Sequence, residues 1–180
     1  MKEKAKAFAI KAHEGQQRKT SNEPYITHPI RVAERLEKNH FSEALISAGY
    51  LHDVVEDTPY EMEDIERNFG KRVKKLVAAH TEDKSKSWQE RKEHTIAMIK
   101  NADKEIKYLI VADKLDNLLE LEKEIELHGP SVWNAFNAGH DKQKWYNQSI
   151  AQNMYHGLQD DEIPPFFSMY KEAVNRVFGQ

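Results

Sequence analysis

The sequence of 180 residues contains no cysteine. Disulfide bonds and thiolate metal sites are therefore excluded, and a cytoplasmic location is expected. No apolar run approaches the ~20 residues that a membrane-spanning helix needs. The opening stretch "MKEKAKAFAI" is too highly charged for a signal peptide. We therefore expect that the membrane is not a partner of this protein.

Strong positive charge is also missing, because the formal net charge is −3. This balance argues against nucleic acid as a partner, so any anionic ligand must be bound by a local cluster of lysine and arginine. No linker rich in proline, glycine or serine divides the chain, and its length suffices for one core. The sequence predicts a single domain over residues 1–180 and indicates no oligomeric state.

Apolar residues recur at spacings of three and four along most of the chain, which predicts an all-α fold. Ser42 is a candidate N-cap for one helix, and Thr58 before Pro59 is a candidate end for it. The expected helices cover residues 2–14, 27–39, 42–57, 61–68, 70–80, 87–100, 104–127, 131–158 and 165–178.

The stretch "YLHDVVEDTPY" at residues 50–60 places polar groups in an apolar segment. On a helix, His52 falls on the same stripe as Leu45 and Val55 and faces inward. Asp53, Glu56 and Asp57 gather at one corner beside it. Buried carboxylates this close repel one another unless a cation or a shared proton is present, which predicts a metal site. The alternative is the solvated acidic end of a helix.

A second polar set lies in "IKYLIVADKLDNLLELEKEI". Asp113 and Asn117 continue the apolar stripe of Ile106 and Ile110, so an acid and an amide occupy core positions. The alternative for Asp113 is a buried salt bridge to a lysine or arginine. Asp116 falls off this stripe and is predicted to be a surface charge.

A third element is "EPYITHPIRVAERL", in which His28 precedes an amphipathic stretch. Alone, His28 is typical of a capping or packing histidine. With His52, Asp53 and Asp113 it completes a set of two histidines and two carboxylates. Such nitrogen and oxygen ligands suit Mn²⁺, Zn²⁺ or Fe²⁺ and leave positions open for water and a phosphate oxygen.

These residues match the H…HD…D ligand pattern of the HD-domain superfamily. The segments "FAIKAHEGQQRK", "PYITHPIRVA", "LHDVVEDT", "IERNFGKRVKKLV" and "ADKLDNL" occur in that order. Over residues 5–121 the chain resembles the hydrolase domain of RelA/SpoT-type proteins, and in length it is similar to small stand-alone alarmone hydrolases. The resemblance implies an HD-domain helical bundle.

The resemblance also implies hydrolysis of the 3′-pyrophosphate of (p)ppGpp to GDP or GTP and pyrophosphate, with Mn²⁺ as the usual ion. Its metal ligands are then His28, His52, Asp53 and Asp113. Glu56 and Asp57 match the acidic pair that orients and deprotonates a water molecule, which agrees with the chemistry of metal-assisted hydrolysis.

For the nucleotide, the resemblance implies contacts from Arg18, Lys19, Lys84 and Asn117. Arginine can bind a phosphate through two hydrogen bonds or stack on a purine, whereas lysine acts as a point charge. Of the other histidines, His13 is expected near the pocket entrance. The remaining six are interpreted as surface or helix-end residues: His40, His80, His94, His128, His140 and His156.

The chain departs from the family after Asn117. Many bifunctional members continue with Met-Arg-Thr-Leu, whereas residues 118–121 here read Leu-Leu-Glu-Leu. Two alternatives therefore stay open. One is a phosphatase of the same fold that acts on another nucleotide such as NADPH. The other is a non-catalytic nucleotide-binding regulatory module, against which the Glu56 and Asp57 pair argues.

Overall fold

The structure is a computed structural model that describes residues 1–179, and within these residues it contains helices and no β-strand. The prediction of an all-α fold is confirmed. Among residues 1–179, none of the helices combines the length and the apolar character that a membrane span requires. The chain divides into two compact units, which are described separately. The N-terminal unit holds residues 1–18 and 22–82, and the C-terminal unit holds residues 19–21 and those from Asp83 onward.

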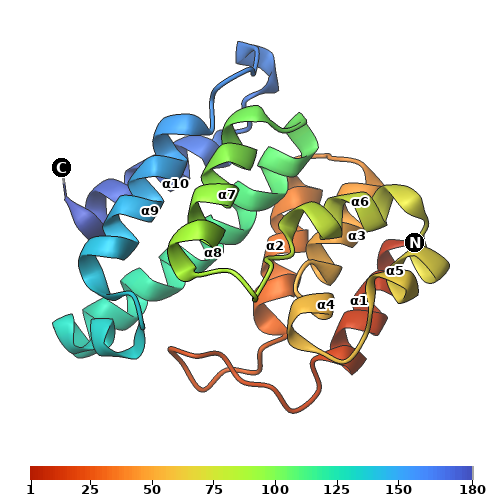
Figure 1. Ribbon diagram of the computed structural model, residues 1–180, viewed down its shortest axis with the longest axis horizontal. Helices are drawn as coiled ribbons and strands as arrows, with labels where there is room; N and C mark the ends of the chain where they lie inside the picture. The colour runs from red at the N-terminus through yellow and green to blue at the C-terminus, as the bar shows by residue number, and fades with distance from the viewer. Residues whose placement is uncertain (180) are drawn as a thin grey trace. The chain divides into compact units, whose positions relative to one another are not determined.

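In the N-terminal unit, α3 is the central helix, and it packs against α1, α2 and α6 (Figure 1). Every residue of α3 from Leu45 to Leu51 is buried, as expected for a helix that is apolar on all sides. The helices of this unit are α1 (Lys2–Ala12), α2 (Thr27–Lys38), α3 (Glu43–Leu51), α4 (Val54–Asp57), α5 (Met62–Phe69) and α6 (Lys71–His80).

Gly49 lets α2 and α3 approach closely. A Cβ atom at this position would lie 3.0 Å from the Cα of Ala33 and 3.0 Å from the Cδ1 of Leu36. Both neighbours belong to α2, and one of the two contacts is with its backbone. The close approach brings the end of α3, where His52 lies, next to the start of α2, where His28 lies.

The prediction of one continuous helix over residues 42–57 was wrong. Ser42 is an N-cap as predicted, since its Oγ accepts a hydrogen bond from the backbone N–H of Leu45 at 3.2 Å. Thr58 is the C-cap that follows α4, also as predicted. Between them the helix is interrupted at His52 and Asp53, where the Asp53 backbone has φ −104° and ψ 0°. Apolar spacing continues through this break, so the pattern could not reveal it.

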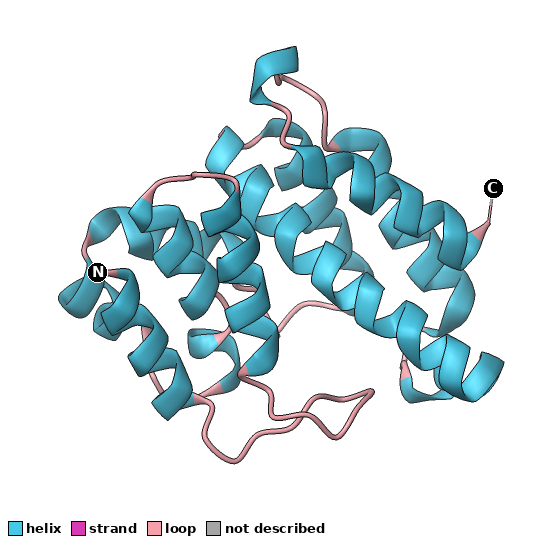
Figure 2. Cartoon of the chain, turned by 180° about the vertical axis from the view of Figure 1, so that it is seen from behind, coloured by secondary structure: helices cyan, strands magenta, loops and turns pink. Residues whose placement is uncertain are grey.

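In the C-terminal unit, α8 packs against α7 and α10. Figure 2, coloured by secondary structure, shows helices and loops and no strand among the described residues. The prediction of a single helix over residues 131–158 was wrong, because Phe136 is extended and Gly139 has a φ of +71°. The elements here are α7 (Trp88–Asn101), α8 (Lys104–His128), η1 (Gly129–Ala135), α9 (Gly139–Asn153), η2 (Asp160–Glu162) and α10 (Pro165–Phe178).

Two charged residues of α8 are unexpectedly buried. Asp116 is 5% exposed, so its prediction as a surface charge was wrong. The reason is that α8 buries residues on several sides, which a single apolar stripe does not describe. Lys107 is 2% exposed, and its Nζ donates hydrogen bonds to the carbonyl oxygens of Lys100 and His156. Burial lowers the pKa of this ammonium group.

Candidate metal centre

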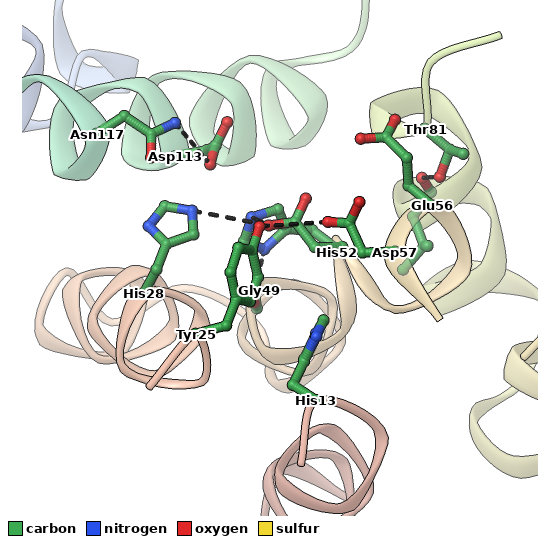
Figure 3. Close-up of polar contacts among 12 residues, drawn as sticks. His13, Tyr25, His28, Gly49, His52, Glu56, Asp57, Thr81, Asp113 and Asn117 are labelled. Carbon is green, nitrogen blue, oxygen red and sulfur yellow. Dashed lines mark hydrogen bonds and ion pairs between the residues drawn. The ribbon is translucent and has the colours of Figure 1, made fainter. Parts of the chain in front are cut away.

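The imidazole rings of His28 and His52 lie close to each other in the N-terminal unit (Figure 3). Their ring centroids are 5.3 Å apart, and both side chains are buried. The Oδ2 atom of Asp53 lies 3.0 Å from the Nε2 of His52 and 3.8 Å from the Nε2 of His28. One potential ligand atom from each of these three residues lies within 4.8 Å of the others. The arrangement places two nitrogen donors and one oxygen donor around a common point.

The donor set fits a divalent metal ion. The Nδ1 of His52 donates a hydrogen bond to the carbonyl oxygen of Gly49 at 2.7 Å, so the neutral ring carries its proton there and presents the lone pair of Nε2 to Asp53. A backbone carbonyl that fixes the tautomer in this way is typical of metal-binding histidines. His80, at the end of α6, packs against His52 with a centroid distance of 4.9 Å. The buried histidine and aspartate cluster therefore suits a divalent ion.

The predicted acidic pair lies on α4, next to this cluster. One carboxylate oxygen from each of Asp53, Glu56 and Asp57 lies within 4.8 Å of the others, so the predicted corner of acids is present. Asp57 is exposed, whereas Glu56 is half-buried and accepts a hydrogen bond from the backbone N–H of Glu82 at 2.8 Å. Burial raises the pKa of Glu56, the hydrogen bond from Glu82 lowers it, and the two neighbouring aspartates raise it further.

Tyr25 also reaches this site, although no helical pattern in the sequence marks it. Its hydroxyl donates to the Oδ2 of Asp53 at 2.6 Å and to the Oδ2 of Asp57 at 3.3 Å. Arg18, a predicted nucleotide contact, lies over the tyrosine ring with its Cζ 5.2 Å from the centroid. The available signal was the position of Tyr25 in the chain, three residues before His28 and just before α2.

Asp113 and Asn117, two predicted site residues, lie on α8 in the C-terminal unit. Asp113 is buried, and its Oδ1 accepts a hydrogen bond from the Nδ2 of Asn117 at 3.4 Å. Its Oδ2 lies 3.0 Å from the Nζ of Lys114, so the alternative of a salt bridge is present in the structure. The metal-ligand role of Asp113 and the nucleotide role of Asn117 stay predictions.

Two predicted lysine contacts also belong to the C-terminal unit. Lys19 is exposed, with its Nζ 5.7 Å from the ring centroid of Phe136. Lys84 is exposed in the segment before α7. Their roles in nucleotide binding stay predictions as well.

Comparisons with known proteins show which family the chain is related to. The HD domain family matches residues 5–141. Human MESH1, described as a guanosine-3′,5′-bis(diphosphate) 3′-pyrophosphohydrolase, is 37% identical over 176 residues, which is 96% of this chain and 90% of MESH1. A GTP pyrophosphokinase of Streptomyces coelicolor is 34% identical over 177 residues, but the match covers only 20% of that longer protein.

Solved structures give the same relationship. The crystal structure of lmo0812 from Listeria monocytogenes EGD-e is 49% identical, with a TM-score of 0.82, and the match covers 85% of this chain and 99% of that one. A metazoan orthologue of SpoT, described as hydrolysing ppGpp, is 30% identical with a TM-score of 0.79 over 97% of this chain and 93% of the other. The chain belongs to the HD domain family.

Proposed function

We propose that this protein is a metal-dependent phosphohydrolase that releases pyrophosphate from the 3′ position of (p)ppGpp and leaves GDP or GTP. The observation that carries the proposal is the convergence of His28, His52 and Asp53 beside the acidic pair of α4. The similarity to MESH1 over nearly the whole chain supports the substrate. We further propose that residues 1–180 act as one domain, because the family match runs through both compact units.

The residues proposed to hold the ion are His28, His52 and Asp53, with Asp113 from the C-terminal unit as the fourth ligand. We propose Mn²⁺ as the native ion, which suits a site of imidazole and carboxylate donors without thiolate. When bound, such an ion supplies a lowered pKa for a coordinated water and polarises a phosphoryl oxygen. The protein contributes the fixed orientation of the two rings and of the Asp53 carboxylate.

Glu56 and Asp57 are proposed to deprotonate and orient the attacking water. Because burial raises the pKa of Glu56, its carboxylate is a better proton acceptor near neutral pH than an exposed glutamate. Asp57, which is exposed, is proposed to orient the water by accepting a hydrogen bond. In the reaction the bond between phosphorus and the ribose 3′ oxygen breaks, a new bond to the water oxygen forms, and the 3′ oxygen leaves with a proton.

Positive and polar side chains are proposed to bind the rest of the nucleotide. Arg18 and Lys19 follow α1 in the "QQRK" segment, Lys84 precedes α7, and Asn117 lies on α8. Arg18 is proposed to stack on the base or to bind a phosphate, since a guanidinium can do both. A cytoplasmic location belongs to the same proposal and rests on the absence of cysteine.

The test is an assay of phosphate and pyrophosphate release from ppGpp, GTP and NADPH, with Mn²⁺ added back to chelated protein. We expect pyrophosphate from ppGpp and no product from GTP. Phosphate from NADPH without pyrophosphate from ppGpp would refute the alarmone substrate in favour of the alternative phosphatase. Binding of ppGpp without turnover would refute the enzyme and favour a regulatory module.

A further inference from the structure

Tyr25 closes a loop between α1 and α2 in the N-terminal unit. Its backbone N–H donates to the carbonyl oxygen of Gln16 at 2.8 Å, and the N–H of Arg18 donates to the carbonyl oxygen of Glu23 at 2.9 Å. These two backbone bonds join residues 16–18 to residues 23–25 and so hold the two sides of the loop together. Tyr25 is half-buried, so both its backbone and its ring are held in place.

The hydroxyl of Tyr25 lies between two carboxylates. Its bond to the Oδ2 of Asp53 is 2.6 Å long, a distance typical of a strong bond from a hydroxyl to an ionised acid. The hydroxyl also lies 3.3 Å from the Oδ2 of Asp57, so its single proton can be donated to either aspartate. A donor placed between two acids reduces their mutual repulsion and therefore keeps them close together.

Asp57 is also tied to the loop that Tyr25 closes. The Nε2 of Gln16 donates to the carbonyl oxygen of Asp57 at 2.9 Å, and the Oε1 of Gln16 lies 2.9 Å from the Nδ1 of His13. His13 is buried, and its ring packs against Tyr25 with a centroid distance of 4.9 Å. The loop thus holds the backbone of Asp57, while the tyrosine hydroxyl holds its side chain.

The ring of Tyr25 has a separate set of neighbours. The guanidinium of Arg18 lies 5.2 Å from its centroid, within the range of a cation–π interaction. The ring of His28 lies 6.2 Å away in an edge-to-face arrangement. One side chain therefore touches a proposed nucleotide contact, a proposed metal ligand and both acids.

We propose that Tyr25 is a positioning residue that fixes Asp53 and Asp57 through its hydroxyl and supports Arg18 through its ring. This inference rests on the proposed function, because it assigns Asp53 to the ion and Asp57 to the water. Two separable effects follow. Loss of the hydroxyl alters metal binding and turnover, whereas loss of the ring alters nucleotide binding as well.

The experiment compares Tyr25→Phe, Tyr25→Leu and the control Tyr60→Phe. Tyr60 lies in the same unit and packs against Phe8 at 4.7 Å, and its hydroxyl makes no hydrogen bond to any residue from 1 to 179 that the structure records. Each variant is measured by Mn²⁺ titration of the metal-free protein and by kcat and KM for ppGpp. Circular dichroism confirms that each is folded.

We expect Tyr25→Phe to weaken Mn²⁺ binding roughly 10-fold and to lower kcat about 10- to 100-fold, the usual effect of removing a residue that orients a ligand. KM should stay within about 2-fold, since the ring that supports Arg18 is kept. Tyr25→Leu should also raise KM several-fold, and Tyr60→Phe should match the wild type.

Wild-type Mn²⁺ affinity and kcat in Tyr25→Phe would overturn the inference, and so would equal losses in Tyr60→Phe. A change confined to KM in Tyr25→Phe would overturn it too, because the hydroxyl would then act on the nucleotide. The Mn²⁺ titration needs no turnover, so it still tests Tyr25 if the wild type fails to hydrolyse ppGpp.

Discussion

The Oε1 of Glu56 accepts a hydrogen bond from the backbone N–H of Glu82 at 2.8 Å. This bond joins α4 to the segment that follows α6, although the two residues are far apart in the sequence. It occupies the Oε1 atom of the Glu56 carboxylate. The side chain is therefore oriented by the backbone of a distant segment.

Glu56→Gln should separate catalysis from metal binding. The glutamine oxygen can still accept the bond from Glu82, but the amide cannot take a proton, so we expect kcat to fall by about 10²- to 10⁴-fold. Metal content should be unchanged, because Glu56 is not among the proposed ligands. The measurements are kcat and elemental analysis, with Glu63→Gln, an exposed glutamate of α5, as the control. Loss of bound metal from Glu56→Gln would contradict the assignment.

The raised pKa of Glu56 predicts a pH dependence of stability in the metal-free protein. A carboxyl group whose pKa is higher in the folded state binds protons more tightly there than in the unfolded state. The free energy of unfolding therefore falls as pH rises from the unfolded pKa, near 4.5, through the higher folded one.

Above that window, metal-free Glu56→Gln should be more stable than the wild type, because it has no charge to bury. Urea unfolding of both proteins at several pH values measures the difference. A difference that stays the same at every pH would show that the ionisation of Glu56 is not responsible.

Asp53→Asn and Asp113→Asn test the proposed ligand set. Each replaces a charged donor with a neutral side chain of nearly the same shape, so we expect both proteins to lose Mn²⁺ during dialysis. Elemental analysis measures the result, and Asp160→Asn, an exposed aspartate of η2, is the control. If Asp113→Asn keeps its metal and only loses stability, then Asp113 serves the salt bridge with Lys114.

Gly49→Ala should destabilise the N-terminal unit. The new methyl group would meet Ala33 and Leu36 of α2 at 3.0 Å, and overpacking of this kind costs about 1–3 kcal/mol. Better helix propensity offsets about 1 kcal/mol, so we expect the free energy of unfolding to fall by up to about 2 kcal/mol.

The matched control is Ser47→Ala in the same helix. The Oγ of Ser47 is buried and has no hydrogen-bond partner among the residues the structure covers, so its removal should be neutral or stabilising. Urea unfolding measures both variants. Equal losses in the two would indicate a general sensitivity of α3 rather than the close approach at Gly49.

Local signals in the sequence predicted much of the fold. Ser42 is the N-cap of α3 and Thr58 is the C-cap of α4, so both predicted ends are present although they belong to two helices. The predicted range 165–178 matches α10. His52 was predicted to face the core because it continues an apolar stripe, and a polar residue there needs a partner. His28 was grouped with it only through the combined set of two histidines and two carboxylates, and the structure brings His28, His52 and Asp53 together.

Other features were missed because contacts between distant residues decide them. Asp116 lies on a helix that is buried on more than one side, so a single stripe could not place it. The role of Tyr25 depends on a loop that carries its hydroxyl to Asp53, which no helical periodicity encodes. Glu82 is oriented toward Glu56 by the path of the chain after α6, and no side-chain signal marks it.

The interruption between α3 and α4 has a consequence for protein design. Consecutive residues of a regular helix point ~100° apart. His52 and Asp53 lie at the break between α3 and α4, and their donor atoms are 3.0 Å from each other, like the two arms of a chelating agent. A designer who transfers this pair to another protein should copy the backbone of the break together with the two side chains.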